Sequence, residues 1–566
     1  MFNKNKLKKI SFKYYLKNSL MFLILFLFSC GWLVEPDAVS SSQARVIANW
    51  NFIPYQHISS TVNVGVVAFH ESGVDVEFEI NGIKTRKTKP EMNPQTSPDN
   101  LNTILSNDTT FKGVYEYFIT VNPANYPDGP VTIKATAYPD DDSYLPKELP
   151  DMIIYANTDG TLNNNTVKYA DSVNGDDDLN NGNTLISAYK TLEKAFVSVG
   201  AGGTVLLAKS SIPYTCQNRG LSGGNYSRWT IISSVTGNPA DVIIIPDTTN
   251  LSSVFLQNFI KWDNVTIRKS SSDYAYYTPT DYHTWFNKCI IESGTYPDSS
   301  GTLINHQNSK YYISDSYIKD FQNPVGWWMR NCVIENTGGD VWRANNDSFF
   351  INIEIRAMNP NPGAHPDLIQ FENPGRTVDN IILYNVKALA MNSQGIFGGG
   401  GSNVAFVNLL MDKNVNDSKL SQPGSFHHLL FWHCTINNIK VVLHSSDNRY
   451  YWHVQNNIFY TLYDELTPCK TSLPMSYIAN NLYIRRNFNQ FNGGYGTDYI
   501  GCVDIETSPG FVDSTNSDAL NRDFHISSDG LAHHVGEVQE CVPADINGDL
   551  FSTTNPTIGS FISTNE

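Results

Sequence analysis

The apolar residues of this chain alternate with polar ones in the manner of β-strands and show no sustained helical stripe. Between residues 264 and 481, ten short segments each place a small or polar residue before alternating apolar residues and a polar turn. These ten residues are Asn264, Cys289, Ser316, Cys332, Asn352, Asn385, Asn408, Cys434, Asn457 and Asn481. Most lie 20 to 27 residues after the one before, and such a period predicts a solenoid of β-coils. A single coil cannot bury its own apolar face, so we expect the coils to stack and build long parallel sheets.

The region 46–155 alternates in the same way in separate short strands, over 62–69, 74–80, 115–121 and 131–137. A Pro-Asp-Gly turn that begins at Pro127 precedes the last of these strands. The stretch resembles an immunoglobulin-like β-sandwich, which implies a spacer or a weak glycan-binding module. The predicted fold class is therefore all-β, with a small β-sandwich domain over 46–155 followed by a solenoid over 165–566. Two domains also suit the length, because 566 residues exceed what one compact core usually holds.

Three segments identify the kind of solenoid. Residues 167–182 read VKYADSVNGDDDLNNG, residues 188–195 read AYKTLEKA, and residues 202–208 read GGTVLLA. This order of strand, polar turn, short capping helix and first coil resembles the start of right-handed parallel β-helix proteins of the pectate-lyase-like superfamily. The closing segments DFHIS at 523–527 and IGSF at 558–561 are similar to the end of such chains. The resemblance spans about 390 residues and implies a right-handed parallel β-helix that acts on polysaccharides.

Residues 1–29 have the features of an export signal. Six lysines precede an apolar run over 20–28 that is too short to span a bilayer comfortably. The run ends in Leu27-Phe28-Ser29-Cys30, which resembles the lipobox of bacterial lipoproteins. This implies cleavage before Cys30, lipidation of its sulfur, a tether over 30–45, and anchoring at the outer membrane or cell surface. The simpler interpretation is an ordinary signal peptide with an incidental cysteine.

The net charge limits the classes of partner that we expect, and the repeat gives the cysteines a structural role. Removing the six lysines of the leader changes the formal net charge from −16 to −22, and such a surface repels nucleic acids. We therefore expect no nucleic-acid partner, and a monomer. Only 17% of the residues are charged while 41% are hydrophobic, which suits an exported all-β protein. Cys289, Cys332 and Cys434 share the repeat and are expected to face inward as small apolar residues.

The candidate chemistry lies where the period breaks, between Ser316 and Asn385. Three blocks follow one another at intervals of 27 residues: Asp340-Val-Trp-Arg343, Asp367-Leu-Ile-Gln370 and Gln394-Gly-Ile-Phe397. This spacing predicts a second row of stacked strands. The loop 358–366 is longer than its neighbours and contains three prolines and a glycine, and it brings His365 next to this row. Loops that depart from a rigid scaffold often carry function.

Each polar residue of the row has a possible role. His365 titrates near neutrality and could transfer a proton, with Asp367 and Arg343 as further catalytic candidates. Asp340 and Asp367, one coil apart, could share a Ca²⁺ ion or act as an acid/base pair. Arg343 and Gln370 could hold a substrate carboxylate or hydroxyl groups. The simpler interpretation is that aspartates at such turns cap strand ends.

Aromatic residues in the same coils suggest a sugar ligand. Trp327, Trp328 and Trp342 could stack on pyranose rings, although tryptophans can equally fill the interior, and alternation places one of the adjacent pair outward. The motifs of polygalacturonase-like enzymes are absent from the solenoid, so no catalytic residue is carried over from the family. The sequence predicts a lipid-anchored lyase or hydrolase acting on an extended, uronate-containing polysaccharide. The alternative is a non-catalytic glycan-binding or adhesive protein that uses the solenoid as a display scaffold.

Overall fold

The computed structural model describes residues 45–98, 111–160, 166–216, 228–246, 259–269, 283–293, 310–321, 326–359, 366–371, 378–398, 401–413, 420–423, 426–441, 444–445, 451–460, 470–471, 477–484, 499–500, 503–505 and 508–563. The leader, Cys30, the tether up to residue 44 and His365 lie outside these ranges. Almost all of the described structure is β-strand, with one α-helix, α3 (Leu192–Val199). The prediction of an all-β chain with a long parallel sheet is confirmed. In the described part of the chain, no helix has the length and apolar content needed to cross a membrane.

The N-terminal part consists of two mainly antiparallel sheets. The first has the order β1-β3-β7-β6, and the second has the order β2-β10-β8-β4-β5 with β9 paired to β8. Their apolar faces share one core, which includes Val66, Phe78 and Ile133. Its immunoglobulin-like character stays a prediction. The strands are β1 (Ile47–Trp50), β2 (His57–Ile58), β3 (Val62–Phe69), β4 (Val74–Ile80), β5 (Ile83–Lys87), β6 (Glu91–Asn93), β7 (Val114–Val121), β8 (Gly129–Pro139), β9 (Lys147–Glu148) and β10 (Met152–Ala156), with the 3-10 turns η2 (Pro94–Thr96) and η3 (Pro123–Asn125).

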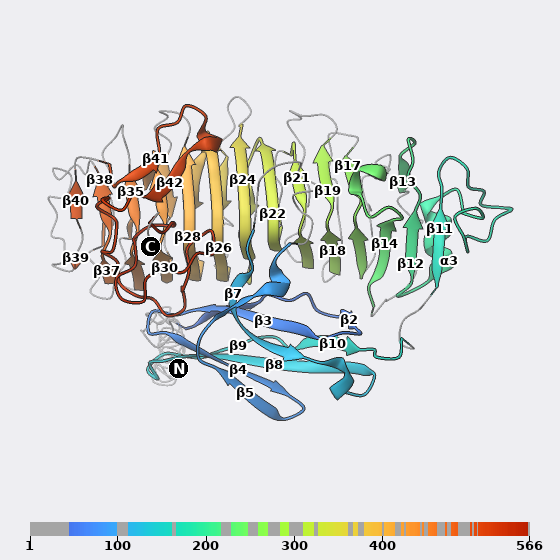
Figure 1. Ribbon diagram of the computed structural model, residues 1–566, viewed down its shortest axis with the longest axis horizontal. Helices are drawn as coiled ribbons and strands as arrows, with labels where there is room; N and C mark the ends of the chain where they lie inside the picture. Colours follow the sequence, from blue (N-terminus) through green and yellow to red (C-terminus); the bar gives the residue numbers. More distant parts are fainter. Residues whose placement is uncertain are drawn as a thin grey trace, which may run out of the picture.

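The remainder is dominated by one long, almost entirely parallel arrangement, drawn as the upper layer of Figure 1. Most strands pair with the strand two positions on, so that successive turns of the chain lie on one another. The strands are β11 (Val167–Ala170), β12 (Thr204–Leu207), β13 (Tyr214–Cys216), β14 (Thr230–Ser234), β15 (Ile243–Pro246), β16 (Ile260–Asp263), β17 (Thr266–Lys269), β18 (His283–Asn287), β19 (Ile290–Ser293), β20 (Lys310–Ser314), β21 (Tyr317–Lys319), β22 (Trp328–Thr337), β24 (Phe349–Met358), β26 (Val378–Met391), β28 (Gly401–Lys413), β30 (His428–Trp432), β31 (Thr435–Asn437), β34 (Tyr451–Gln455), β35 (Ile458–Tyr460), β37 (Tyr477–Ala479), β38 (Leu482–Ile484), β39 (Tyr499–Ile500) and β40 (Val503–Ile505).

Successive turns of the chain share a bend at a residue with left-handed backbone geometry. The bends lie at Asn264, Lys288, Asp315, Asn331, Asn352, Asn385, Asn408, His433, Asn456 and Asn480, with φ between 50° and 59° except at Asp315, where φ is 49°. Asparagine and aspartate tolerate this region better than most residues. The bend splits each coil into two strand faces, and β22, β24, β26 and β28 run through it without interruption.

The sequence alignment of the repeat mixed two neighbouring columns. The pairing register places Cys332 opposite Ile353, and it places Thr435, the residue after Cys434, opposite Leu410. Cys332 and Cys434 therefore follow the bend residues Asn331 and His433 and are not bend residues themselves. Asn264, Asn352, Asn385 and Asn408 are bend residues themselves. The described column cysteines are buried and free of disulfide bonds, which confirms that they face inward.

The bend asparagines form a hydrogen-bonded ladder along the coils. The side-chain amide of Asn385 donates to Asn352 Oδ1 at 3.0 Å, and that of Asn408 donates to Asn385 Oδ1 at 2.9 Å. The amide of Asn352 donates in turn to Asn331 Oδ1 at 3.0 Å. A buried amide requires such partners, since an unsatisfied polar group is costly inside a protein. The ladder therefore fixes the height at which each coil turns.

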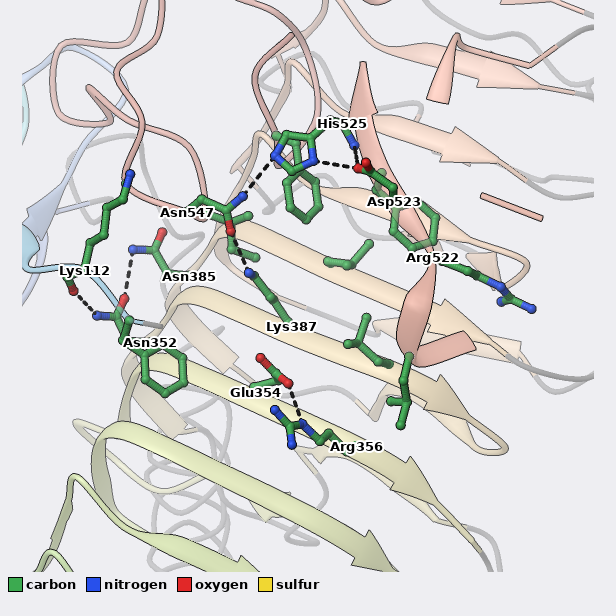
Figure 2. A pocket seen from close by; sticks show the side chains of 18 of the residues that line it. Lys112, Asn352, Glu354, Arg356, Asn385, Lys387, Arg522, Asp523, His525 and Asn547 are labelled. Atoms are coloured by element: carbon green, nitrogen blue, oxygen red, sulfur yellow. Dashed lines mark hydrogen bonds and ion pairs between the residues drawn. The ribbon is translucent and has the colours of Figure 1, made fainter. Parts of the chain in front are cut away.

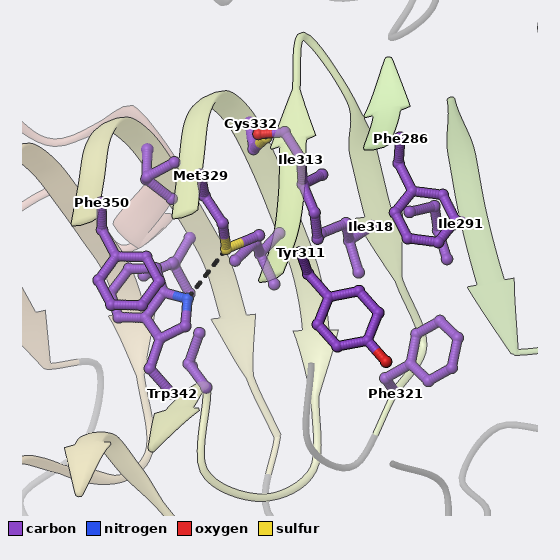
Figure 3. Packing of buried hydrophobic residues seen from close by; sticks show 14 of the residues in the cluster. Phe286, Ile291, Tyr311, Ile313, Ile318, Phe321, Met329, Cys332, Trp342 and Phe350 are labelled. Atoms are coloured by element: carbon purple, nitrogen blue, oxygen red, sulfur yellow. Dashed lines mark hydrogen bonds between the residues drawn. The ribbon is translucent and has the colours of Figure 1, made fainter. Parts of the chain in front are cut away.

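A third face is formed by the shorter parallel sheet β23-β25-β27-β29-β32. It contains β23 (Trp342–Arg343), β25 (Asp367–Gln370), β27 (Gln394–Gly398), β29 (Leu420–Pro423) and β32 (Lys440–Val441), while β33 (His444–Ser445) pairs with β36 (Lys470–Thr471). The space between the faces is filled by apolar side chains, as Figure 3 shows for Phe286, Tyr311 and Met329. Helix α3 contributes Leu192, Ala195 and Phe196 to this core at the first coil, as the predicted capping helix should.

Two other segments lie against the outside of the coils. The N-terminal sandwich runs along the middle coils (Figure 1), and its Ile47, Val67 and Phe69 join an apolar cluster with Trp328 and Tyr384. The C-terminal segment folds back over the later coils. It contains β41 (Phe511–Asp513), β42 (Asp523–Ile526) and the 3-10 turn η6 (Ala519–Asn521), while a further 3-10 turn, η4 (Pro239–Asp241), lies between β14 and β15. The sandwich is therefore fastened to the coils rather than held apart from them.

Candidate functional site

The three blocks expected to stack at intervals of 27 residues do so. Strand β23 pairs with β25 with Arg343 opposite Gln370, and β25 pairs with β27 with Gln370 opposite Phe397. The side chain of Arg343 is 59% exposed, and Gln370 and Phe397 are partly exposed. Arg343, Gln370 and Phe397, which we call the outer row, thus form a line of side chains on the surface of the third face. His365, which was expected beside it, falls outside the described residues.

Asp340 is engaged within the protein. Its Oδ1 accepts the backbone N–H of Asp367 at 3.1 Å, and its Oδ2 accepts Arg343 Nη2 at 3.2 Å. Asp367 is fully buried. A Ca²⁺ ion shared by the two carboxylates would have to displace a guanidinium and a peptide N–H, so this donor set does not fit the ion. Across the described residues, no group of three or more histidine, cysteine, aspartate or glutamate side chains could hold a metal.

Two of the three candidate tryptophans, Trp342 and Trp328, are buried, so the expectation that they stack on a sugar ring is wrong. Trp342 is 0% exposed and stacks on Phe350 at 4.4 Å between ring centroids, with its Nε1 3.2 Å from Met329 Sδ (Figure 3). Trp328 is 1% exposed because the sandwich covers it, and its Nε1 donates to Trp50 O at 3.0 Å. Neither ring can stack on a sugar. Alternation placed one of the adjacent pair outward correctly, but the outward ring became an interdomain contact.

Trp327 remains partly exposed. Its ring is covered by the ammonium group of Lys310, 3.8 Å from the centroid, and its Nε1 donates to Asn346 O at 2.9 Å. A sugar would have to displace the lysine to stack on this face. Trp327 therefore stays a weaker candidate for ligand binding than the sequence suggested.

A cavity of about 450 Å³ lies where the coils, the sandwich and the C-terminal segment meet. We call it the junction pocket (Figure 2). Its floor is made by β24, β26 and β28 after their bends, and its walls by residues 111–113 of the sandwich and residues 520–525 and 546–548 of the C-terminal segment. Pockets of this size, with few polar groups converging on them, are the usual places for small ligands.

The floor carries charged side chains in register. Glu354 pairs with Lys387 in the neighbouring strand, and each lies two residues after its bend asparagine. Ile355, which lies between Glu354 and Arg356, and Ala388, which follows Lys387, belong to the interior core. Because strand side chains alternate, Glu354, Arg356 and Lys387 must point outward into the pocket. Arg356 Nε donates to Glu354 Oε1 at 2.5 Å (Figure 2).

Lys387 is held without a carboxylate partner among the described residues. Its Nζ donates to Asn547 Oδ1 at 2.6 Å. Burial in the pocket lowers the pKa of Lys387, and the nearby charges of Glu354 and Asp545 only partly oppose this effect. Burial disfavours the charged form of an amine, and this is why the pKa of Lys387 shifts downward.

A hydrogen-bonded chain extends from this lysine. Asn547 Nδ2 lies 3.1 Å from His525 Nε2, and His525 Nδ1 lies 2.6 Å from Asp523 Oδ1 (Figure 2). The amide donates to Nε2, so the ring proton belongs on Nδ1, where it is donated to the aspartate. Asp523, His525 and Asn547 therefore orient one another and the lysine. Titratable side chains that converge in a cleft and hold one another by hydrogen bonds are candidates for an active site.

A second buried pair supports the wall of the pocket. Arg522 Nη1 donates to both oxygens of Asp412, at 2.9 and 2.8 Å. The carboxylate of Asp412 is 0% exposed, and burial raises its pKa to about 6 although Asn437 and Arg522 oppose the shift. This pair ties η6 and β42 to the end of β28. It fixes His525, three residues further on, over the floor.

The junction pocket is not among the sites expected from the sequence. The pattern DFHIS at 523–527 was predicted only to close the solenoid. One signal was available: Glu354 and Lys387 place charges between apolar neighbours at the same offset from the asparagines Asn352 and Asn385, and Arg356 follows on the same side of its strand. The contact of these strands with the C-terminal segment, which comes far later in the chain, could not be read from a local pattern.

Comparisons with known proteins do not assign this chain to a family. No family model matches the chain, and no curated protein matches it. Among solved structures, one match is a PL6 family alginate lyase, AlyGC, at 7% sequence identity and a TM-score of 0.23. The match covers 66% of this chain and 57% of that structure, so this chain spans little more than half its length. Values this low establish neither a shared fold nor a shared activity.

Proposed function

We propose that this protein is a surface-anchored enzyme that cleaves an extended, uronate-containing polysaccharide by acid–base chemistry in the junction pocket. The observation that carries the proposal is Lys387, a lysine with a lowered pKa that faces a cavity beside Arg356 and Glu354. The stacked coils, which we propose form a right-handed parallel β-helix, provide a rigid support for a long ligand. The export signal and the lipid on Cys30 belong to the proposal as the means of anchoring.

In a lyase reaction, the side chains of the pocket would have the following roles. The neutral amine of Lys387 removes the proton on C5 of a uronate, the C4–O4 bond breaks, and a C4=C5 double bond forms. The guanidinium of Arg356 lies beside the substrate carboxylate and stabilises the negative charge that develops next to it. The leaving oxygen takes a proton from the solvent. Asn547 keeps Lys387 in place throughout, because its Oδ1 accepts from the amine.

The outer row is a second place where a glycan could bind. Its exposed Arg343 and partly exposed Gln370 and Phe397 repeat along the coil axis, as the units of a sugar chain would. The catalytic set His365, Asp367 and Arg343 stays a proposal for this face. The exposed side chains of this row also suit the alternative function, a non-catalytic glycan-binding or adhesive lipoprotein that uses the coils as a display scaffold.

A variant test separates these functions. The assay follows the ultraviolet absorbance of unsaturated product ends on a panel of uronate polysaccharides. We expect Lys387→Ala to lower kcat at least about 100-fold in this assay, because the variant lacks the proposed base. The activity of the wild type should increase with pH, because the neutral amine is the reactive form.

The matched control is Lys319→Ala, which removes an outward lysine from the same strand face three coils earlier. Equal activity in Lys387→Ala and Lys319→Ala would refute the junction pocket as the centre of catalysis. Glycan binding by the wild type without any new reducing or unsaturated end would support the adhesive alternative instead.

A further inference from the structure

The sandwich approaches the coils through its backbone as well as its apolar side chains. Asn380 at the start of β26 accepts from Ala48 N at 3.1 Å and donates to Ala48 O at 2.9 Å. Asn331 at a bend donates to Thr96 O at 2.7 Å. Paired backbone groups of this kind fix the register between two bodies, because each unsatisfied buried group would be costly. The sandwich therefore has one defined position on the coils.

That position brings residues 111–113 to the rim of the junction pocket. Asn352, the bend residue of β24, donates from its side-chain amide to Lys112 O at 3.0 Å and to Asn331 Oδ1 at 3.0 Å. The same strand carries Glu354 and Arg356 on the pocket floor. The backbone of Lys112 is thus tied to the ladder that positions the floor.

The side chain of Lys112 reaches across to the opposite wall. Its ammonium group forms an ion pair with Asp549, and its stem lies against Gly548, where an added Cβ would meet it at 3.1 Å. Gly548 has a φ of +79°, which suits glycine. The turn that holds both residues is closed by Asp545 Oδ1, which accepts Asn547 N at 2.8 Å and Asp549 N at 2.9 Å. This turn also carries the amide that holds Lys387.

We propose that the sandwich is a fixed wall of the junction pocket and that Lys112 is its specificity-determining residue, which selects a carboxylate- or sulfate-bearing sugar over a neutral one. This inference rests on the proposed function. The side chain of Lys112 is 47% exposed and lines the pocket, so a ligand can reach it while Asp549 holds its ammonium group at the rim. An anionic group of the ligand would replace or share the contact with Asp549, at a point where an otherwise acidic chain presents a cation.

Binding measurements with two probes test the inference. Calorimetry would compare the affinity of the full chain for a hexamer of a uronic acid and for a hexamer of neutral glucose units. We expect Lys112→Met, which keeps much of the apolar stem, to weaken uronate binding about five-fold, as for one partly exposed charge contact, and to leave binding of the neutral hexamer unchanged. Lys112→Arg should retain most of the preference.

The control is Lys84→Met on β5, which also removes an exposed lysine from an ion pair, with Glu77, in the same sandwich. Unchanged uronate affinity in Lys112→Met, or an equal loss in Lys84→Met, would overturn the role of Lys112 while leaving the proposed function intact. Absence of uronate binding by the wild type would overturn both. An equal weakening for both hexamers would show a structural effect and would also overturn the assigned specificity.

Discussion

Glu116 on β7 shows how strongly a single residue can depend on the contact between the sandwich and the coils. Its carboxyl group is buried, accepts Asn93 Nδ2 at 2.6 Å, and lies near Arg330 of β22. Burial raises the pKa of Glu116 to about 7, although the hydrogen bonds from Asn93 and Asn51 oppose the shift. Gly65 leaves the room that this carboxyl group fills, because an added Cβ would lie 2.2 Å from it.

The raised pKa of Glu116 predicts a loss of stability towards alkaline pH. The folded state holds the proton up to about pH 7, whereas the unfolded carboxyl group loses it near the ordinary value of 4.5. The contribution of Glu116 to the free energy of unfolding is therefore present below pH 4.5 and lost as the pH rises to 7. We expect it to amount to on the order of 2 kcal/mol. Urea unfolding at pH 5 and pH 8 should show this loss in the wild type and a smaller one in Glu116→Gln.

Glu77→Gln is the matched control, since Glu77 is paired with Lys84 at the outer surface of the sandwich. Its pH dependence should equal that of the wild type. If Glu116→Gln also follows the wild type, the carboxyl group does not hold its proton through this range.

At the scale of the element, the bend ladder decides where each coil turns. The sequence repeat predicted stacked strands correctly because coils of similar length bring equivalent residues into register, as in the 27-residue intervals of the third face. It could not separate bend residues from the inward residues that follow them. Asn385 at a bend and Asn457 just after one are the same amino acid with different backbone geometry. Only the pairing register distinguishes them.

The ladder predicts an order of stabilities at Asn385. Asn385→Ala removes two side-chain hydrogen bonds and places alanine at a φ of 55°, so we expect a loss of about 3 kcal/mol. Asn385→Gly loses the same bonds but accepts the backbone geometry, so its loss should be about 1 kcal/mol smaller. Thermal and urea unfolding of both variants measure this difference. A glycine variant as unstable as the alanine variant would mean that the left-handed bend contributes nothing at this position.

At the scale of the whole molecule, a buried polar cluster joins the sandwich to the coils. Glu71 of the sandwich lies 3.5 Å from His70 Nε2 and 3.2 Å from His428 Nε2 of β30. His428 Nδ1 lies 2.9 Å from Asn403 Oδ1. The hydroxyl group of Tyr144 donates to the hydroxyl oxygen of Tyr451 at 3.2 Å. Burial alone would raise the pKa of Glu71, but His428 and His70 lower it to about 2. The carboxylate therefore stays charged across the physiological range.

The same cluster predicts weaker docking in acid. Burial lowers the pKa of His70 to about 4, against the opposing effect of Glu71. The folded pKa is below the unfolded value of 6.5, so the contribution is present above pH 6.5 and lost as the pH falls towards 4. We expect on the order of 2 kcal/mol to be lost between pH 7 and pH 5. His70→Gln should reduce this loss in urea unfolding.

His534→Gln provides the comparison, because His534 is exposed on the C-terminal segment, away from this cluster. It should leave the acid dependence unchanged. If His70→Gln and His534→Gln behave alike, the acid sensitivity arises elsewhere in the fold.

The sequence by itself determined the all-β class, the parallel stacking and the row of Arg343 and Gln370, because these follow from local alternation and from the repeat length. It also determined that the cysteines of the repeat face inward. The tertiary structure decided the rest. Trp328 lies in the contact between the sandwich and the coils, and Lys387, Asn547 and His525 lie together in the junction pocket. Contacts between segments 150 or more residues apart depend on how the sandwich and the C-terminal segment dock on the coils. That docking is set by the shape and hydrogen bonding of whole surfaces, which no local pattern records.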